Sequence, residues 1–187
     1  LTDKVKDGIL NWTATEGDWK LYAIFRAWHG KIVERAAPGG EGDVIDHFNK
    51  TALDNYLKKF DEALKGKDIS SLRAFFNDSY EVDDARGQAD FTPLLFDEFA
   101  KRRNYDLKEY LPALFGQDTL DNINIRVLTD YRLTISELLL ENFTTPWGQW
   151  AKKNGAIIRN QAHGSPANIL DLYAAVDIPE TEGEDIL

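Results

Sequence analysis

Several polar side chains follow a short apolar segment at residues 74–76 and end in a carboxylate. The segment reads AFF, and the run after it reads NDSYE, which contains Asn77, Asp78, Tyr80 and Glu81. Such groups can hydrogen-bond hydroxyls, and a carboxyl group can also donate or accept a proton. The alternative is structural, because the same side chains could cap a neighbouring helix or solvate the rim of a sheet.

A second strand ending, at residues 176–182 (VDIPETE), contains Glu180 and Glu182. Residues two apart point to the same face of a strand, so the two carboxylates could hold a metal, or one could tune the pKa of the other. A solvated strand end is the alternative for either residue.

A third predicted strand, residues 156–162, contains Asn160 and Gln161 near its end and is followed by His163-Gly164. A histidine at a strand tip is most often a structural hydrogen-bonding group, but its amide neighbours also favour a binding role. The other two histidines have no comparable setting.

The spacing of apolar residues predicts strands and helices that alternate through most of the chain. Residues 20–28 and 31–37 are expected to form two strands joined at His29-Gly30. Periodicity and terminal signals predict helices at 46–64, 92–104, 107–115, 127–154 (kinked by Pro146) and 166–175 (with Ser165 as N-cap). Strands are expected at 72–79, at 156–162 and from 177 onward.

This order predicts a parallel sheet with helices on its faces, an α/β fold with about four strands in the alternating part. The carboxyl ends of parallel strands meet at one edge, where such folds place their catalytic groups. The polar strand ends are therefore expected to lie close together. Four strands are too few to close an eight-stranded barrel.

Composition limits the class of partner. The chain has 187 residues, 43% hydrophobic content and a net charge of -10, which predicts one globular domain and argues against nucleic acid or an anionic membrane as partner. It contains no cysteine, so thiol chemistry is excluded. No apolar stretch is long enough to span a membrane, and Leu1 opens on a polar sequence without signal-peptide features.

Two glycine-rich or acidic segments do not match known ligand motifs. Residues 38–42 (PGGEG) lack the ending of a phosphate-binding loop, so a turn is the better interpretation. Asp83, Asp84 and Asp90 lack the spacing of an EF-hand and are expected to form a solvated loop.

Three segments resemble the catalytic-domain motifs of glycoside hydrolase family 106, which contains α-L-rhamnosidases. They are NDSYE at 77–81, RNQAHGSPAN at 159–168 and DIPETE at 177–182. The similarity begins near Trp19 and includes residues 35–42 and the region of Trp147.

The resemblance implies a secreted or periplasmic bacterial enzyme that removes terminal α-L-rhamnose from plant polysaccharides with inversion and calcium assistance. It also implies a TIM-type (β/α)8 barrel with long helices on the outside. Glu81 would be the general acid and Glu182 or Glu180 the base, or the base would lie beyond Leu187. The substrate hydroxyls would be held by Asp78, Tyr80, Asn160, Gln161 and His163.

Family members are far longer, so residues 1–187 are expected to be an incomplete catalytic domain that needs the rest of the parent enzyme or further copies of the chain. One rival hypothesis is a barrel glycosidase of the retaining type, whose two carboxyl groups would be only about 5 Å apart. Another is a carbohydrate-binding or non-catalytic scaffold fragment whose acids are rim groups.

Overall fold

The structure is a computed structural model, which describes residues 1–80, 82, 90–117 and 122–181. It is a mixed α/β fold with two small sheets. The elements before α4 are η1 (Thr2–Lys4), β1 (Val5–Lys6), β2 (Ile9–Leu10), α1 (Lys50–Leu64), β3 (Ala74–Asn77), α2 (Leu95–Arg103), η2 (Leu107–Tyr110) and α3 (Leu111–Leu114). The later elements are α4 (Ile123–Leu139), the π-helical turn η3 (Leu140–Thr144), α5 (Thr145–Lys153), β4 (Ile157–Gln161), α6 (Ile169–Ala174) and β5 (Ile178–Glu180).

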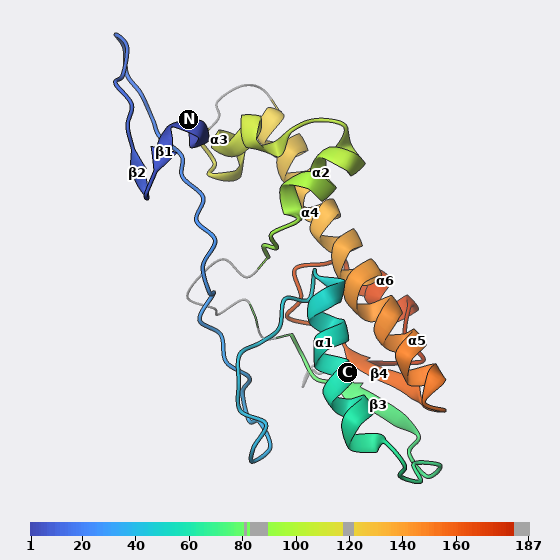
Figure 1. Cartoon of the computed structure of the whole chain (residues 1–187). Coiled ribbons are helices and arrows are strands. Elements are labelled where there is room, and N and C mark those ends of the chain that lie inside the picture. The colour runs from blue at the N-terminus through green and yellow to red at the C-terminus, as the bar shows by residue number, and fades with distance from the viewer. Residues whose placement is uncertain (81, 83–89, 118–121, 182–187) are drawn as a thin grey trace.

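The helices α4, η3 and α5 form one continuous rod along the molecule (Figure 1). The predicted long helix is therefore confirmed, but the expected kink takes the form of a π-helical turn before Pro146. Proline has no N–H and its ring obstructs the carbonyl four residues earlier. The N–H of Thr145 bonds instead to the carbonyl of Leu140, five residues back.

The main sheet is parallel, in the order β3-β4-β5. Asn77 pairs in register with Asn160, and Gln161 pairs with Glu180. The predicted parallel sheet is thus confirmed, with three strands among the described residues. The predicted TIM barrel remains a prediction.

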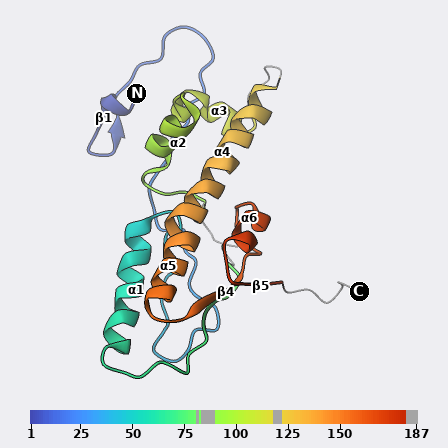
Figure 2. The ribbon, with the colours of Figure 1, turned by 90° about the vertical axis from the view of Figure 1, so that its right-hand side faces the viewer.

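One face of the sheet packs against helices. Phe75 and Ile158 point to this covered face, where Phe75 contacts Trp150 at a ring-centroid distance of 4.6 Å. The carboxyl-terminal half of the rod and α1 both lie alongside the sheet in the two views (Figures 1 and 2). The largest cluster of buried apolar residues lies here and includes Leu139, Phe143 and Trp147.

Alternate residues of a strand point to opposite faces, so the remaining side chains of β3, β4 and β5 share the other face. We call this the open face, and it consists of Ala74, Phe76, Ile157, Arg159, Gln161, Ile178 and Glu180. Phe76 is 47% exposed.

A second, smaller cluster surrounds the amino-terminal half of the rod. Phe99 and Leu107 are fully buried there against Val127 of α4. Arg102 of α2 forms ion pairs with Glu98 of its own helix and with Glu137 and Glu141. These contacts attach α2 to the rod.

The predicted strands at 20–28 and 31–37 are wrong. The segment is extended but unpaired except for a single bridge between Ile32 and Asp43, and Gly30 has a φ of 82°. Phe25 is 83% exposed and Trp28 is 63% exposed. The β-branched and aromatic composition suited a strand, but no neighbouring strand among the described residues supplies the hydrogen bonds.

The start of α6 also differs from the sequence prediction. Asn168, rather than Ser165, is the N-cap, and its side chain accepts a hydrogen bond from the N–H of Leu170. Both residue types are good N-caps, so composition alone did not distinguish them.

Replacing Leu139 by alanine is expected to lower the free energy of unfolding by about 3 kcal/mol, because a fully buried leucine loses its apolar contacts and leaves a cavity. Leu133→Ala, on the same helix at a site that is 45% exposed, is the matched control and should cost less than about 1 kcal/mol. Urea unfolding followed by tryptophan fluorescence measures both, and equal losses would contradict the placement of the core.

Candidate functional site

Polar side chains from all three strands meet at the carboxyl edge of the sheet. Because the strands are parallel, the ends at Asn77, Gln161 and Glu180 lie side by side. The loops after β3 and β4 are also joined, since the N–H of Tyr80 donates to the carbonyl of His163 at 3.2 Å. The structure therefore brings together most of the described residues that the sequence singled out.

On the open face, four side chains form a connected series. The guanidinium of Arg159 lies over the ring of Phe76, 4.6 Å from its centroid. Its Nε donates to Oε2 of Glu180, and Nε2 of Gln161 donates to Oε1 of the same carboxylate at 2.8 Å. Both oxygens of Glu180 are thus engaged by donors.

These two donors determine the protonation state of Glu180. Arg159 first, and Gln161 second, lower the pKa of the Glu180 carboxyl to about 2. A carboxylate with so low a pKa is a weak proton acceptor, although it can orient the groups that donate to it.

A buried polar group lies on the covered face. Nδ2 of Asn77 donates to Oδ1 of Asn160 at 2.8 Å, and Asn160 is fully buried. Burial raises the pKa of the Tyr80 hydroxyl, while Thr144 and Asn160 act in the opposite direction. The three side chains lie close together. Within the described residues, however, no hydrogen bond of acceptable geometry is formed by the Tyr80 hydroxyl, Thr144 Oγ1 or Asn160 Nδ2.

Burial bears on the predicted binding roles of these residues. Tyr80 is 4% exposed, so its side chain supports the carboxyl edge from inside. Asp78 is exposed, and its Oδ1 accepts a hydrogen bond from the N–H of Ser79 at 2.8 Å. Of the two, Asp78 is the one that solvent can reach, and the assignment of both residues to substrate binding stays a prediction.

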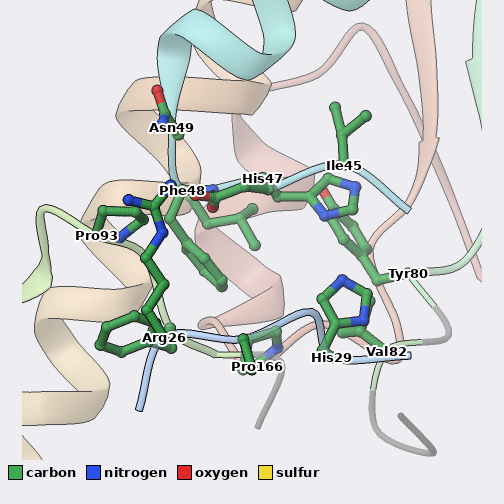
Figure 3. Close-up of a pocket in the computed structure, with 14 residues that line it drawn as sticks. Arg26, His29, Ile45, His47, Phe48, Asn49, Tyr80, Val82, Pro93 and Pro166 are labelled. Carbon is green, nitrogen blue, oxygen red and sulfur yellow. The ribbon is translucent and has the colours of Figure 1, made fainter. Parts of the chain in front are cut away.

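A cavity of about 250 Å³ adjoins Tyr80 and Pro166, which follow β3 and β4 respectively. Figure 3 shows Arg26, His29 and His47 around it. None of these three residues belongs to a site predicted from the sequence. The sequence feature that could have indicated this cavity is the pair Asp46-His47, which interrupts an otherwise apolar run at 44–48.

Asp46 lies in the wall of this cavity and accepts a hydrogen bond from Thr92 at 2.8 Å. Burial raises the pKa of the Asp46 carboxyl, against smaller opposite effects of Thr92, the Phe48 N–H, His29 and Arg26. The cavity thus combines one partly buried carboxylate with a guanidinium and two imidazoles.

His47 is enclosed by aromatic rings. Its ring centroid lies 5.0 Å from that of Tyr80 and 4.7 Å from that of Phe143. Burial, and to a smaller extent the charge of His29, lower the pKa of the His47 imidazole to about 4. The imidazole is therefore neutral at pH 7.

Glu81 and Glu182, the predicted acid and one predicted base, lie outside the described residues. Among the residues that are described, no group of three or more His, Asp or Glu side chains could hold a metal ion. The calcium expected from the resemblance is therefore untested, and no chemical step is assigned to it. In the described part of the chain, no helix has the length and apolar character needed to cross a bilayer.

Comparison with known proteins gives one family and two relatives. A family model described as alpha-L-rhamnosidase matches residues 1–182. A protein of Formosa agariphila, provisionally named a beta-glucuronidase, is 30% identical over 95% of the chain and 16% of its own length. A solved rhamnosidase structure from Novosphingobium sp. PP1Y is similar over 79% of the chain and 15% of its own, with 25% identity and a TM-score of 0.60. The chain thus spans about a sixth of each relative.

Protonation of His47 should destabilise the fold as the pH falls. Its pKa is about 4 in the folded protein and about 6.5 when unfolded, so the unfolded state binds the proton first. Stability is therefore unaffected above pH 6.5 and falls between pH 6.5 and 4, by about 2 kcal/mol after allowance for the partial exposure of the ring.

Urea unfolding at pH 7, 5.5 and 4, with wild type and His47→Asn, measures this effect. The difference in stability between the two proteins isolates the contribution of His47. Asp46 and Glu180 contribute equally to both proteins: the raised pKa of Asp46 acts in the opposite direction, and Glu180 loses its stabilising charge only below pH 4.5. A pH dependence that is unchanged in His47→Asn would contradict the assignment.

Proposed function

The chain belongs to the glycoside hydrolase family whose model is described as alpha-L-rhamnosidase, and we propose that it forms part of an enzyme that releases terminal α-L-rhamnose from plant-type polysaccharides. The observation that carries this proposal is the meeting of carboxylate and amide groups at the carboxyl edge of the sheet. Sugar hydroxyls both donate and accept hydrogen bonds, and groups of both kinds are present there.

The sheet is proposed to be part of the wall of a (β/α)8 barrel. One face of it is covered by helices, as on the outside of such a barrel, and the open face would then point inward. Within the described residues, β3 and β5 each pair along one side only. Further strands of the parent polypeptide would pair with these edges, and a homo-oligomer is the alternative source of them.

In the proposed mechanism Glu81 is the general acid. Its carboxyl proton passes to the glycosidic oxygen as the bond to the anomeric carbon breaks, which requires a carboxyl group kept protonated by its surroundings. The candidates for the general base are Glu182, Glu180 and a residue in another part of the parent enzyme. The base removes a proton from a water that attacks the opposite face of the sugar, so the configuration inverts and the two carboxyl groups stand about 6.5–9.5 Å apart.

The proposed partners and location follow from the family. The ligand is a rhamnose-containing glycan, and the parent enzyme is proposed to act in the periplasm or outside a bacterial cell. The alternative is a carbohydrate-binding or scaffold fragment without catalytic activity, in which Asp78 and Glu180 only solvate the sheet edge.

A second candidate activity is hydrolysis of a β-glucuronide, which the provisional name of the Formosa agariphila relative suggests. The guanidinium of Arg26 in the cavity beside Tyr80 supports it, since guanidinium groups suit the carboxylate of a uronic acid. The two activities differ in the sugar released.

Glu81→Gln is expected to lower kcat/KM for aryl α-L-rhamnosides by about 10² to 10⁴, the usual contribution of general acid–base catalysis. The loss should be larger for a phenyl than for a 4-nitrophenyl leaving group, because the better leaving group needs less protonation. Hydrolysis of both rhamnosides and of the aryl β-glucuronides, with and without a calcium chelator, measures this in the protein at its natural length.

Glu62→Gln, on the exposed side of α1, is the matched control and should retain full activity. A folded Glu81→Gln protein with wild-type rates would refute the acid assignment. Cleavage of the glucuronides alone would favour the second candidate, and sugar binding without turnover by wild type would favour the binding fragment.

A further inference from the structure

The amide of Gln161 is held in a fixed orientation at the carboxyl edge of the open face. Its Nε2 donates to Glu180 at 2.8 Å, and a carboxylate can only accept, so the nitrogen must face Glu180. The carbonyl oxygen Oε1 must therefore point away from that carboxylate. This oxygen is buried and has no hydrogen-bond partner among the described residues.

A buried acceptor without a donor requires an explanation, because its desolvation is not compensated. Gln161 is only 9% exposed, so it cannot turn freely to exchange its two amide atoms. Its oxygen is thus an acceptor that is oriented before any ligand arrives, which lowers the cost of binding a hydroxyl donor.

Arg159 and Phe76 fix the other end of the same series. The guanidinium donates to Oε2 of Glu180 and lies over the Phe76 ring. The carboxylate is consequently held from two sides, by Arg159 and by Gln161. Such an arrangement suits a group that positions its neighbours, whereas a general base needs an oxygen free to approach water.

We propose that Glu180 is a positioning residue and not the general base, and that Arg159 and Glu180 orient the Gln161 amide so that its Oε1 accepts a hydrogen bond from a hydroxyl of the sugar substrate. The inference rests on the proposed glycosidase function for the identity of the ligand. It leaves the role of general base to Glu182 or to another residue of the parent enzyme.

The first test is kinetic, on aryl α-L-rhamnosides in the protein at its natural length. Gln161→Met keeps the side-chain length but removes the acceptor, and it should raise KM about three- to tenfold with kcat changed less than threefold. Arg159→Ala should also raise KM, and Arg159→Lys should recover part of that loss. The control is Arg132→Ala, which changes an exposed arginine elsewhere and should leave KM and kcat unchanged.

Variants of Glu180 distinguish a positioning role from a role as general base. Glu180→Gln retains an acceptor for Gln161 and should keep kcat within threefold of wild type, and azide should not restore activity to Glu180→Ala. A fall in kcat of about 10² or more in Glu180→Gln, together with recovery of Glu180→Ala by azide, would overturn the proposal.

Substrates that lack one ring hydroxyl identify the partner of Gln161. Wild type should discriminate about three- to tenfold against one of the 2-, 3- and 4-deoxy rhamnosides, and Gln161→Met should lose that discrimination. Equal effects of Gln161→Met on all substrates would overturn the proposal. A crystal structure with an ordered water on Oε1 that the bound sugar does not displace would also overturn it.

A binding measurement separates this inference from the proposed function. If wild type hydrolyses no glycoside, L-rhamnose and D-glucuronate are titrated by NMR against wild type and Gln161→Met. If the variant binds the sugar at least threefold more weakly than wild type, the role of Gln161 in binding is supported although the proposed hydrolase function is refuted. Equal binding, or no binding by wild type, would refute the role of Gln161.

Discussion

The close contact between the helical rod and one face of the parallel sheet is the constraint on which the rest of the structure depends. A Cβ on Gly148 of α5 would come within 3.2 Å of Cδ1 of Ile158 on β4, so the glycine allows the helix to lie near the strand. This approach buries Ile158 and also leaves Thr144 without solvent contact. Tyr80 and Asn160 lie beside it, and Asn160 also accepts a hydrogen bond from Asn77.

The two faces of the sheet consequently use carboxylates and amides in different ways. On the covered face the amide of Asn160 is fully buried and stabilises Asn77 at the end of the next strand. On the open face Arg159 compensates the charge of Glu180 and lowers its pKa. Asp46, near the same edge, has a raised pKa because burial outweighs the opposite effects of Thr92 and Arg26. Burial and pairing with Arg159 thus shift the pKa values of two carboxyl groups near one edge in opposite directions.

The sequence predicted the helices and strands that depend on local apolar spacing. It did not predict the features that depend on contacts between residues far apart in the chain. The apolar spacing of α1 and the segments that became β3, β4 and β5 were enough to predict helices, strands and their parallel order. Residues 20–28 carry a strand composition, but strand formation needs a neighbour that the sequence does not identify. The cavity residues His29 and His47 lie at a predicted strand joint and in the first turn of a predicted helix, and only tertiary packing brings them to Tyr80.

The π-helical turn at Leu140–Thr144 has a consequence for how this helix tolerates changes of length. Leu139, Phe143, Trp147 and Ala151 are spaced four apart and are all buried, although such a series drifts by about 40° per step in a regular α-helix. The wider turn between them offsets part of that drift. Deletion of one residue here would convert the wider turn into regular α-helix, and because that turn already absorbs the rotation of about one residue, the segment after it would keep nearly the same orientation. Trp147 would then stay on the buried side, so this turn is a position at which the helix can lose a residue without moving its later apolar side chains out of the core.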